Sequence, residues 1–171
     1  PELAESWQFS DNGLALTYTL REDLKWSDGE PLTADDVVFT YNDIFLNDTI
    51  PTQIRDILRV GEDGTLPTIT KLNQRQVKFE VPEPYAPFLR NTGVSILPKH
   101  ALETAITETD SDGNPLFLST WGTSTPPAEI IVNGPFKLKA FTPGERVIFE
   151  RNPYYWRTDD AGQDQPYLEE V

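Results

Sequence analysis

The chain has 171 residues, enough for one domain with a real core, and it has no Cys, which excludes disulfides and thiolate metal sites. It carries 28 acidic against 14 basic residues, and the net charge of −14 argues against nucleic-acid binding, because such a field repels phosphates. We interpret the acidity as a source of solubility in preference to a means of attracting cationic ligands. No apolar run is long enough to cross a membrane, and because the first residue is Pro1, the absence of a signal peptide says nothing about compartment.

The first predicted element is a β-hairpin. Trp7 and Phe9 alternate with polar residues, and Asn12-Gly13 follows as a turn in which positive φ is tolerated. The next strand alternates too, so one of its faces should be buried. The residues on that face are Leu14, Leu16, Tyr18 and Leu20.

The best-specified element is a helix from Thr33 to about Asn47. Thr33 is a suitable N-cap, and Asp36 occupies the reciprocal position of a capping box, where Glu or Gln is preferred. Asp35 and Asp36 also place negative charge at the positive end of the helix dipole. An apolar stripe at helical spacing should be buried. It contains Ala34, Val37, Val38, Tyr41, Ile44 and Phe45.

The middle of the chain predicts shorter elements. A short helix is expected after Pro51, a second hairpin across residues 69–81, and a helical turn at 85–89. A further helix begins near Pro98, which suits a first turn. The single histidine, His100, lies on it and is expected at the helix surface, because one His without Cys makes a poor metal or catalytic site.

An acidic loop at residues 108–114 has two interpretations. Its spacing imitates the first half of an EF-hand, with Gly113 at the sharp turn. However, Glu108 replaces the leading Asp and Ser119 stands where the bidentate Glu should be. We therefore favour a surface loop over a calcium site and expect no metal.

The last specific block predicts a third hairpin. Phe136, Leu138 and Ala140 should share one face, Pro143-Gly144 suits a type II turn, and residues 147–149 return. The aromatic group at residues 154–156 is a ligand platform or, more commonly, part of a small core.

These motifs together resemble one family. Residues 20–41, read as LREDLKWSDGEPLTADDVVFTY, are similar to the signature segment of the extracellular solute-binding proteins of ABC importers, family 5, which includes dipeptide, oligopeptide and nickel binders. The blocks at residues 133–138 and 150–156, NGPFKL and ERNPYYW, match a second segment of that family.

The resemblance implies an α+β fold with a small, mainly antiparallel sheet and short flanking helices, as a subdomain of a two-lobed periplasmic-binding-protein fold. Because both ends fall inside the family pattern, residues 1–171 are expected to be a single subdomain, the lobe I insert, truncated at both ends. The implied function is capture of peptides or similar small solutes outside the cytoplasmic membrane of a bacterium and delivery to ABC permease subunits. No enzyme activity and no cofactor are expected, and any membrane association would come from an N-terminal signal or a lipid anchor.

Two other functions stay open at this level, a hydrolase and a stand-alone interaction domain. The sequence has no G-x-S-x-G motif, no Cys and one His, so an acyl-transfer triad has few candidates. For the solute-binding function, the resemblance implies loops that approach the ligand. The candidate residues in these loops are Thr52, Gln53, Asn91, Thr92 and Ser95.

Overall fold

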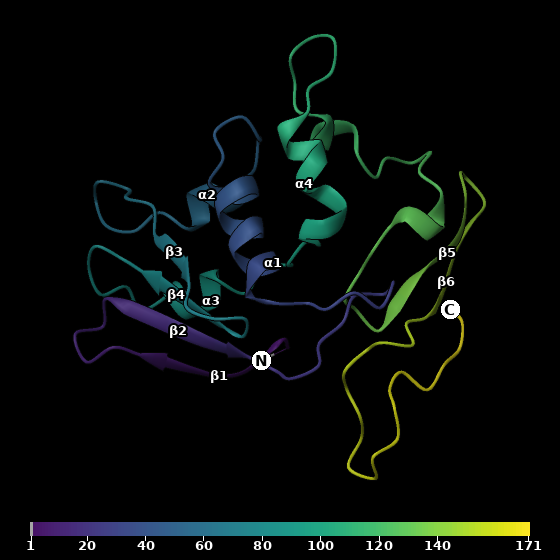
Figure 1. Cartoon of the computed structure of the whole chain (residues 1–171), viewed down its shortest axis with the longest axis horizontal. Helices are drawn as coiled ribbons and strands as arrows, with labels where there is room; N and C mark the ends of the chain where they lie inside the picture. The colour runs from purple at the N-terminus through teal and green to yellow at the C-terminus, as the bar shows by residue number, and fades with distance from the viewer. Residues whose placement is uncertain (1) are drawn as a thin grey trace. The chain divides into compact units, whose positions relative to one another are not determined.

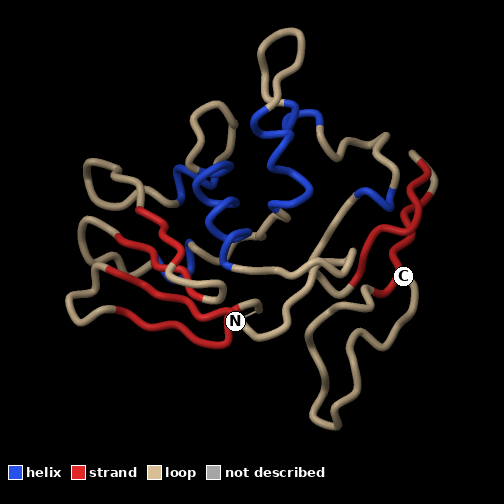
Figure 2. The backbone as a smooth tube through the Cα atoms, in the orientation of Figure 1, coloured by secondary structure: helices blue, strands red, loops and turns tan. Residues whose placement is uncertain are grey.

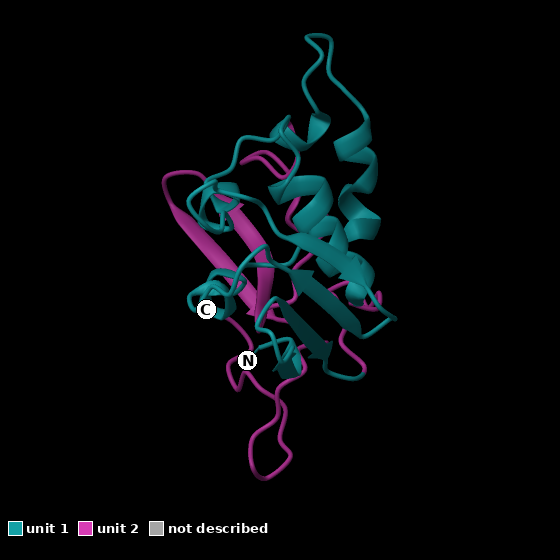
Figure 3. Cartoon of the chain, turned by 90° about the vertical axis from the view of Figure 1, so that its left-hand side faces the viewer, with its two compact units in different colours: residues 1–22, 33–118 teal, residues 23–32, 119–171 magenta. Residues whose placement is uncertain are grey.

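The computed structural model describes residues 2–171 and contains two compact units, coloured separately in Figure 3. Among the described residues, unit 1 comprises 2–22 and 33–118, and unit 2 comprises 23–32 and 119–171. Antiparallel strands and short helices make up the fold, which confirms the α+β class. The expectation that residues 1–171 act as one subdomain of a first lobe stays a prediction.

Figure 1 shows the order of the elements along the chain, and Figure 2 distinguishes helices, strands and loops. Unit 1 contains β1 (Ala4–Phe9), β2 (Ala15–Leu20), α1 (Ala34–Val38), the π-helical segment η1 (Phe39–Phe45), α2 (Ile54–Ile57), β3 (Thr68–Lys71), β4 (Gln76–Glu80), α3 (Phe88–Asn91) and α4 (Lys99–Thr107). The 3₁₀ turn η2 (Leu116–Ser119) follows, and unit 2 then contains the 3₁₀ turn η3 (Pro127–Glu129), β5 (Phe136–Thr142) and β6 (Arg146–Arg151).

The four strands of unit 1 form an antiparallel sheet in the order β1-β2-β4-β3. Both predicted hairpins of this unit are confirmed, β1 with β2 and β3 with β4. In the first turn only Gly13 has a positive φ, of 70°, and Ser10 accepts its amide, so the loop is longer than the two-residue type that Asn-Gly favours.

The predicted helix is present as α1 followed by η1. Its start is the expected capping box: the Thr33 hydroxyl accepts from the Asp35 amide, and the Asp36 carboxylate accepts from the Thr33 amide at 2.8 Å. This reciprocal arrangement satisfies amides that have no partner within the helix. A shorter acidic side chain therefore fills the reciprocal role at the third helical position, where Glu or Gln is usually preferred.

The second half of this helix departs from the prediction. In η1 the amide of Leu46 donates to the Tyr41 carbonyl at 2.8 Å, five residues back. A turn that closes at i+5 holds more residues than the 3.6 assumed by the stripe, so the buried face shifts. Phe39, absent from the predicted stripe, is 2% exposed, whereas Val38 is only half-buried.

The core of unit 1 lies between this helix and one face of the sheet. The ring of Tyr41 meets that of Phe79 on β4 edge-on, with centroids 4.8 Å apart, and Phe79 also contacts Tyr18 and Phe88 edge-on. Edge-to-face packing suits the quadrupoles of the rings. Each large side chain buried here contributes roughly 1.5–3 kcal/mol, so the stripe and the sheet stabilise each other.

In unit 2, β5 and β6 form the predicted third hairpin, with Gly144 at φ 74° as a type II turn requires. The pairing shifts register between Leu138 and Ala140, which makes a β-bulge at Lys139. Because a bulge reverses the alternation of faces, Ala140 lies on the face opposite Leu138. The expectation that Phe136, Leu138 and Ala140 share one face is therefore wrong for Ala140.

Candidate functional site

Four of the five predicted ligand residues lie on two short helices of unit 1 and their ends. Thr52 and Gln53 precede α2, and Asn91 and Thr92 end α3. The Asn91 amide donates to the Ile57 carbonyl at 2.9 Å, so the end of α3 is tied directly to the end of α2. Since α2 is a single turn long, the structure brings these two loops into one region.

Thr92 is a buried hydrogen-bonding centre. Its carbonyl accepts from the Tyr41 hydroxyl at 2.7 Å, and its own hydroxyl donates to the Leu89 carbonyl and contacts the hydroxyl of Tyr18. Burial raises the pKa of both tyrosines, so both stay neutral donors at neutral pH. The Thr92 side chain therefore serves the fold and is fully engaged there.

The segment that follows Thr92 is attached at its far end to the helix formed by α1 and η1. The Leu97 amide donates to the Thr40 hydroxyl at 2.9 Å, and the Lys99 amide donates to the buried Asp36 carboxylate at 2.9 Å. The Asp36 side chain is 4% exposed, and because its carboxylate also accepts from the Thr33 amide, it joins the starts of α1 and α4. Ser95, between the attachments at Thr92 and Leu97, is exposed.

The loop before α2 has its own anchor. Arg55 donates to the carbonyls of Phe45, Asn47 and Ile50, and its guanidinium lies 3.5 Å from the Asp48 carboxylate. A planar guanidinium suits this work because it presents several donors in a fixed geometry. Thr52 accepts from the Ile54 amide at 3.2 Å, which leaves Gln53 as the exposed predicted side chain of this loop.

The sequence analysis proposed these loops as candidates without the contacts that hold them. Arg55, Asp36 and Tyr41 carry the anchoring contacts, and none of them was a predicted site residue. Arg55 directly follows Thr52-Gln53-Ile54. A single cation beside polar loop residues is the one feature of the sequence that could have indicated its anchoring role. Of the predicted residues, Gln53 and Ser95 present exposed side chains, whereas Thr52, Asn91 and Thr92 each make an internal hydrogen bond.

The acidic loop is organised by one carboxylate. Asp110 accepts from the amides of Asp112 and Asn114, each at 2.9 Å, and the bond from Asn114 is the main reason that the pKa of Asp110 lies below its usual value. Across residues 2–171, no group of three or more potential metal-ligating side chains comes together. His100 is exposed on α4, as predicted.

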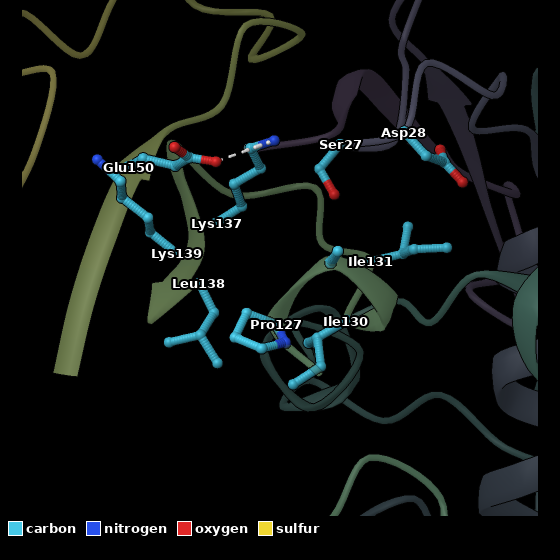
Figure 4. Close-up of a pocket in the computed structure, with 10 residues that line it drawn as sticks. Ser27, Asp28, Pro127, Ile130, Ile131, Lys137, Leu138, Lys139 and Glu150 are labelled. Atoms are coloured by element: carbon cyan, nitrogen blue, oxygen red, sulfur yellow. Dashed lines mark ion pairs between the residues drawn. The ribbon is translucent and has the colours of Figure 1, made fainter. Parts of the chain in front are cut away.

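Unit 2 contains a separate cavity of about 270 Å³ beside β5 (Figure 4). One side is apolar and includes Pro127, Ile130 and Leu138, and the other carries Ser27, Asp28, Lys137, Lys139 and Glu150. Lys137 and Glu150 face each other across the hairpin with 3.2 Å between their charged atoms. The cavity thus combines an apolar wall with charges that are already paired.

The aromatic group of unit 2 is only partly buried. Tyr154 is 41% exposed, lies under the Lys25 ammonium at 5.5 Å, and packs against Gly29 so closely that a Cβ there would come 3.1 Å from its hydroxyl oxygen. Gly29 has φ 94°, so a side chain there would be strained in conformation and tight against the ring. Trp156 is half-buried beneath the Arg157 guanidinium. Of these rings, Tyr154 packs against the turn around Gly29.

Comparison with known proteins defines the class. Residues 1–171 match the model of the bacterial extracellular solute-binding proteins, family 5, middle region, and the chain belongs to this family. The family consists of solute-binding proteins and not of enzymes. They are the substrate-binding components of ABC transporters, and their ligands vary between members.

Particular relatives show that variety. The chain is 33% identical to a periplasmic alpha-galactoside-binding protein of Rhizobium meliloti, with all of this chain and 25% of the relative covered. It is 31% identical to the solved structure of an oligopeptide-binding protein OppA, at TM-score 0.79, with 100% of this chain and 29% of that one covered. It is also 31% identical to NikZ from Campylobacter jejuni in complex with Ni(L-His), at TM-score 0.65, over 91% of this chain and 28% of that one.

The chain thus spans between a quarter and three tenths of the length of these relatives. The match to solved solute-binding proteins also confirms the fold that the resemblance implied. Within residues 2–171, no helix has the length and apolar character needed to span a membrane.

Proposed function

We propose that this chain is part of the substrate-binding component of an ABC importer, which captures peptides or similar small solutes and delivers them to permease subunits. The observation that carries the proposal is the family match over residues 1–171. Relatives named as periplasmic support a periplasmic or cell-surface location in a bacterium, held there as a free protein or through a lipid anchor. The hydrolase alternative is not retained, because the family is not enzymatic.

Within this chain, the proposed ligand-facing surface consists of the two anchored loops of unit 1. Gln53 and Ser95 would contact the solute directly, since their side chains are exposed beside rigid attachments. Thr52, Asn91 and Thr92 would set the positions of these loops through their internal hydrogen bonds. Polar groups held on a rigid scaffold fit a receptor that must bind without reorganising its own backbone.

Peptides are the proposed solute class. Gln53 and Ser95 can each donate and accept, which suits the alternating N–H and C=O groups of a peptide backbone. Both are neutral, and no cluster of three or more potential metal ligands forms among the described residues. These features favour an uncharged hydrogen-bonding ligand over a nickel ion here.

The test is calorimetric titration of the full-length protein with a pool of di- to pentapeptides, with galactoside oligosaccharides and nickel as separate arms. We expect saturable peptide binding at about micromolar Kd or tighter, near −8 kcal/mol. Gln53→Ala and Ser95→Ala should each weaken binding about tenfold, at roughly 1 kcal/mol for a lost hydrogen bond. The matched controls are Gln8→Ala and Ser111→Ala, at exposed positions outside the two loops.

Saturable binding of sugar or nickel with no response to peptides would reject the peptide assignment. If binding is equally weakened by Gln53→Ala and by Gln8→Ala, the loops of unit 1 are not the contact surface. A protein that binds none of these solutes would contradict the proposed function itself.

A further inference from the structure

The basic side chains of the chain differ in whether the protein itself provides them with a partner. The sequence has 14 Lys and Arg residues against 28 acidic ones. Within residues 2–171, every basic side chain except that of Arg90 contacts a carboxylate, a backbone carbonyl or an aromatic ring. Arg90 is exposed, and its charge is therefore left for a group that these residues do not supply.

Arg90 lies on the solvent side of α3. Phe88 and Thr92 are 2% and 9% exposed and face the core of unit 1. The Asn91 side chain is turned toward α2, where it donates to the Ile57 carbonyl at 2.9 Å. Because these positions occupy one side of the helical turn, Arg90 lies on the other. The backbone that carries it is held at Asn91 and Thr92, so the guanidinium extends from a fixed position.

The acidic residues nearest to Arg90 in the sequence are directed elsewhere. The Glu83 carboxylate lies against the turn at Gly61, 3.2 Å from the place that a Cβ of this glycine would occupy. The Glu103 carboxylate lies 3.4 Å from the Lys99 ammonium. The Arg90 guanidinium can therefore accept an acidic group of a ligand without first breaking an internal ion pair.

A guanidinium favours a particular kind of anion. Its planar fork of N–H donors matches the two oxygens of a carboxylate in a bidentate pair. One carboxylate also balances the single charge of Arg90. A phosphate group with about two negative charges would keep one of them uncompensated in the field of a chain whose net charge is −14. The charge balance thus favours a single carboxylate over a phosphate.

The residues proposed to contact the solute lie within the length of a short peptide from Arg90. Ser95 follows five positions later, so its Cα lies at most about 18 Å away. Gln53 begins the single turn of α2, which rises about 6 Å to the end that is bonded to Asn91. An extended peptide of three to five residues spans roughly 10–18 Å. Ile57, 47% exposed at the end of α2, adds an apolar contact for a peptide side chain.

We propose that Arg90 binds the C-terminal carboxylate of a peptide whose uncharged backbone groups contact Gln53 and Ser95. This inference rests on the proposed function and adds to it the end of the solute that the surface recognises. Stabilisation of the helix dipole is a lesser role for Arg90, because α3 has only four residues and so only a small dipole.

Calorimetric titration of the full-length protein with two matched pools of di- to pentapeptides tests this proposal. One pool has free C-termini and the other has amidated C-termini, so the pools differ only at the carboxylate. The wild-type protein should bind the free pool about tenfold more tightly, as expected for one charge-assisted pair. Equal affinity for the two pools would overturn the role of Arg90 and leave the proposed function standing. Failure to bind either pool would reject peptide binding itself, and this proposal with it.

Arg90→Gln removes the charge at an exposed position. It should weaken binding of the free pool about tenfold and leave binding of the amidated pool unchanged, so that the preference between the pools disappears. Arg90→Lys keeps the charge without the fork and should retain part of the preference. Arg146→Gln is the matched control, because Arg146 is an exposed arginine at the start of β6 that already lies beside Glu145, and it should keep the full preference.

A purely structural role for Arg90 would give different results. If Arg90 pairs with an acidic group of the polypeptide outside residues 1–171, Arg90→Gln should lower the urea midpoint of the full-length protein and weaken binding of both pools equally. That outcome would overturn the proposal, and so would a preference for the free pool that Arg90→Gln leaves intact.

Discussion

Removal of the Asp36 carboxylate should destabilise unit 1 more than removal of the Thr33 hydroxyl or the Asp35 carboxylate, which also lie at the start of α1. The side chain is 4% exposed and accepts two backbone amides, from Thr33 at 2.8 Å and from Lys99 at 2.9 Å. These amides are 66 residues apart in the sequence and begin different helices. Asp36→Ala therefore leaves two helix starts without their acceptor.

The expected cost is about 3 kcal/mol. A hydrogen bond to a charged acceptor contributes about 1.5–3 kcal/mol, and part of the loss is recovered where water reaches the Thr33 amide. Asp36→Asn should cost about half as much, because its NH₂ group would face one of the two amides in place of an acceptor oxygen. Thr33→Ala removes only the single cap bond to the Asp35 amide and should cost roughly 1 kcal/mol.

The measurement is urea unfolding followed through NMR signals of Val77 and Phe79, which are buried in the unit 1 sheet and so report this unit separately. Asp35→Ala is the matched control. It removes a carboxylate from the same helical turn whose partner is the Lys71 ammonium at 2.7 Å in a half-exposed ion pair, a change of at most about 1 kcal/mol. Equal losses for Asp35→Ala and Asp36→Ala, or a greater loss for Thr33→Ala, would refute the reasoning.

Three further predictions follow from individual contacts. Tyr41→Phe keeps the ring but removes the hydrogen bond to the Thr92 carbonyl, and it should lower the free energy of unfolding in urea by about 1–2 kcal/mol. Tyr41→Ala also removes the buried ring and should cost about 3 kcal/mol or more. No loss of stability in Tyr41→Phe would exclude a role for the hydroxyl. Arg55→Lys should cost about 1–2 kcal/mol and speed amide exchange at residues 47–50, because a compact ammonium cannot reproduce the spread of donors on the guanidinium. Arg59→Lys, at an exposed position after α2, should do neither. The Tyr167 hydroxyl lies 2.7 Å from the Asp159 carboxylate and lowers the pKa of that carboxyl. The contribution of Asp159 to stability is therefore present above the ordinary Asp pKa and is lost as the pH falls through the lowered pKa. In an NMR titration Tyr167→Phe should raise the Asp159 midpoint, and an unchanged midpoint would show that the hydroxyl is not the cause.

Local sequence signals predicted the elements that depend on neighbouring residues. The capping box at Thr33 and Asp36, the hairpin turn at Pro143-Gly144 and the two hairpins of unit 1 all form as expected. Each rests on backbone preferences or hydrogen bonds within a few residues, and such preferences act in the same way whatever the rest of the fold does.

Features that depend on distant residues were not predictable in this way. The stripe assumed a 3.6-residue turn, but Thr40 and Tyr41 are drawn into contacts with Leu97 and Thr92, more than 50 residues away, and the helix there closes at i+5. The bulge at Lys139 likewise has no local marker in the sequence. At the candidate site, loop composition identified polar residues but could not separate Thr92, which is buried, from Ser95, which is exposed.

The way in which the Thr92–Lys99 segment is attached bears on how such a site can vary. Its anchors are backbone atoms, the Thr92 carbonyl and the amides of Leu97 and Lys99, and their partners all lie on the helix that begins at Thr33. Side chains between the anchors can therefore change without removing any of these bonds. The family's members include proteins named for galactosides, oligopeptides and nickel, and a loop fixed by its backbone is one physical means by which a single framework presents different groups to different solutes. In the proposed site, the contacts at the start of the helix would determine where the loop lies, and the exposed side chains of the loop would determine which solute it binds.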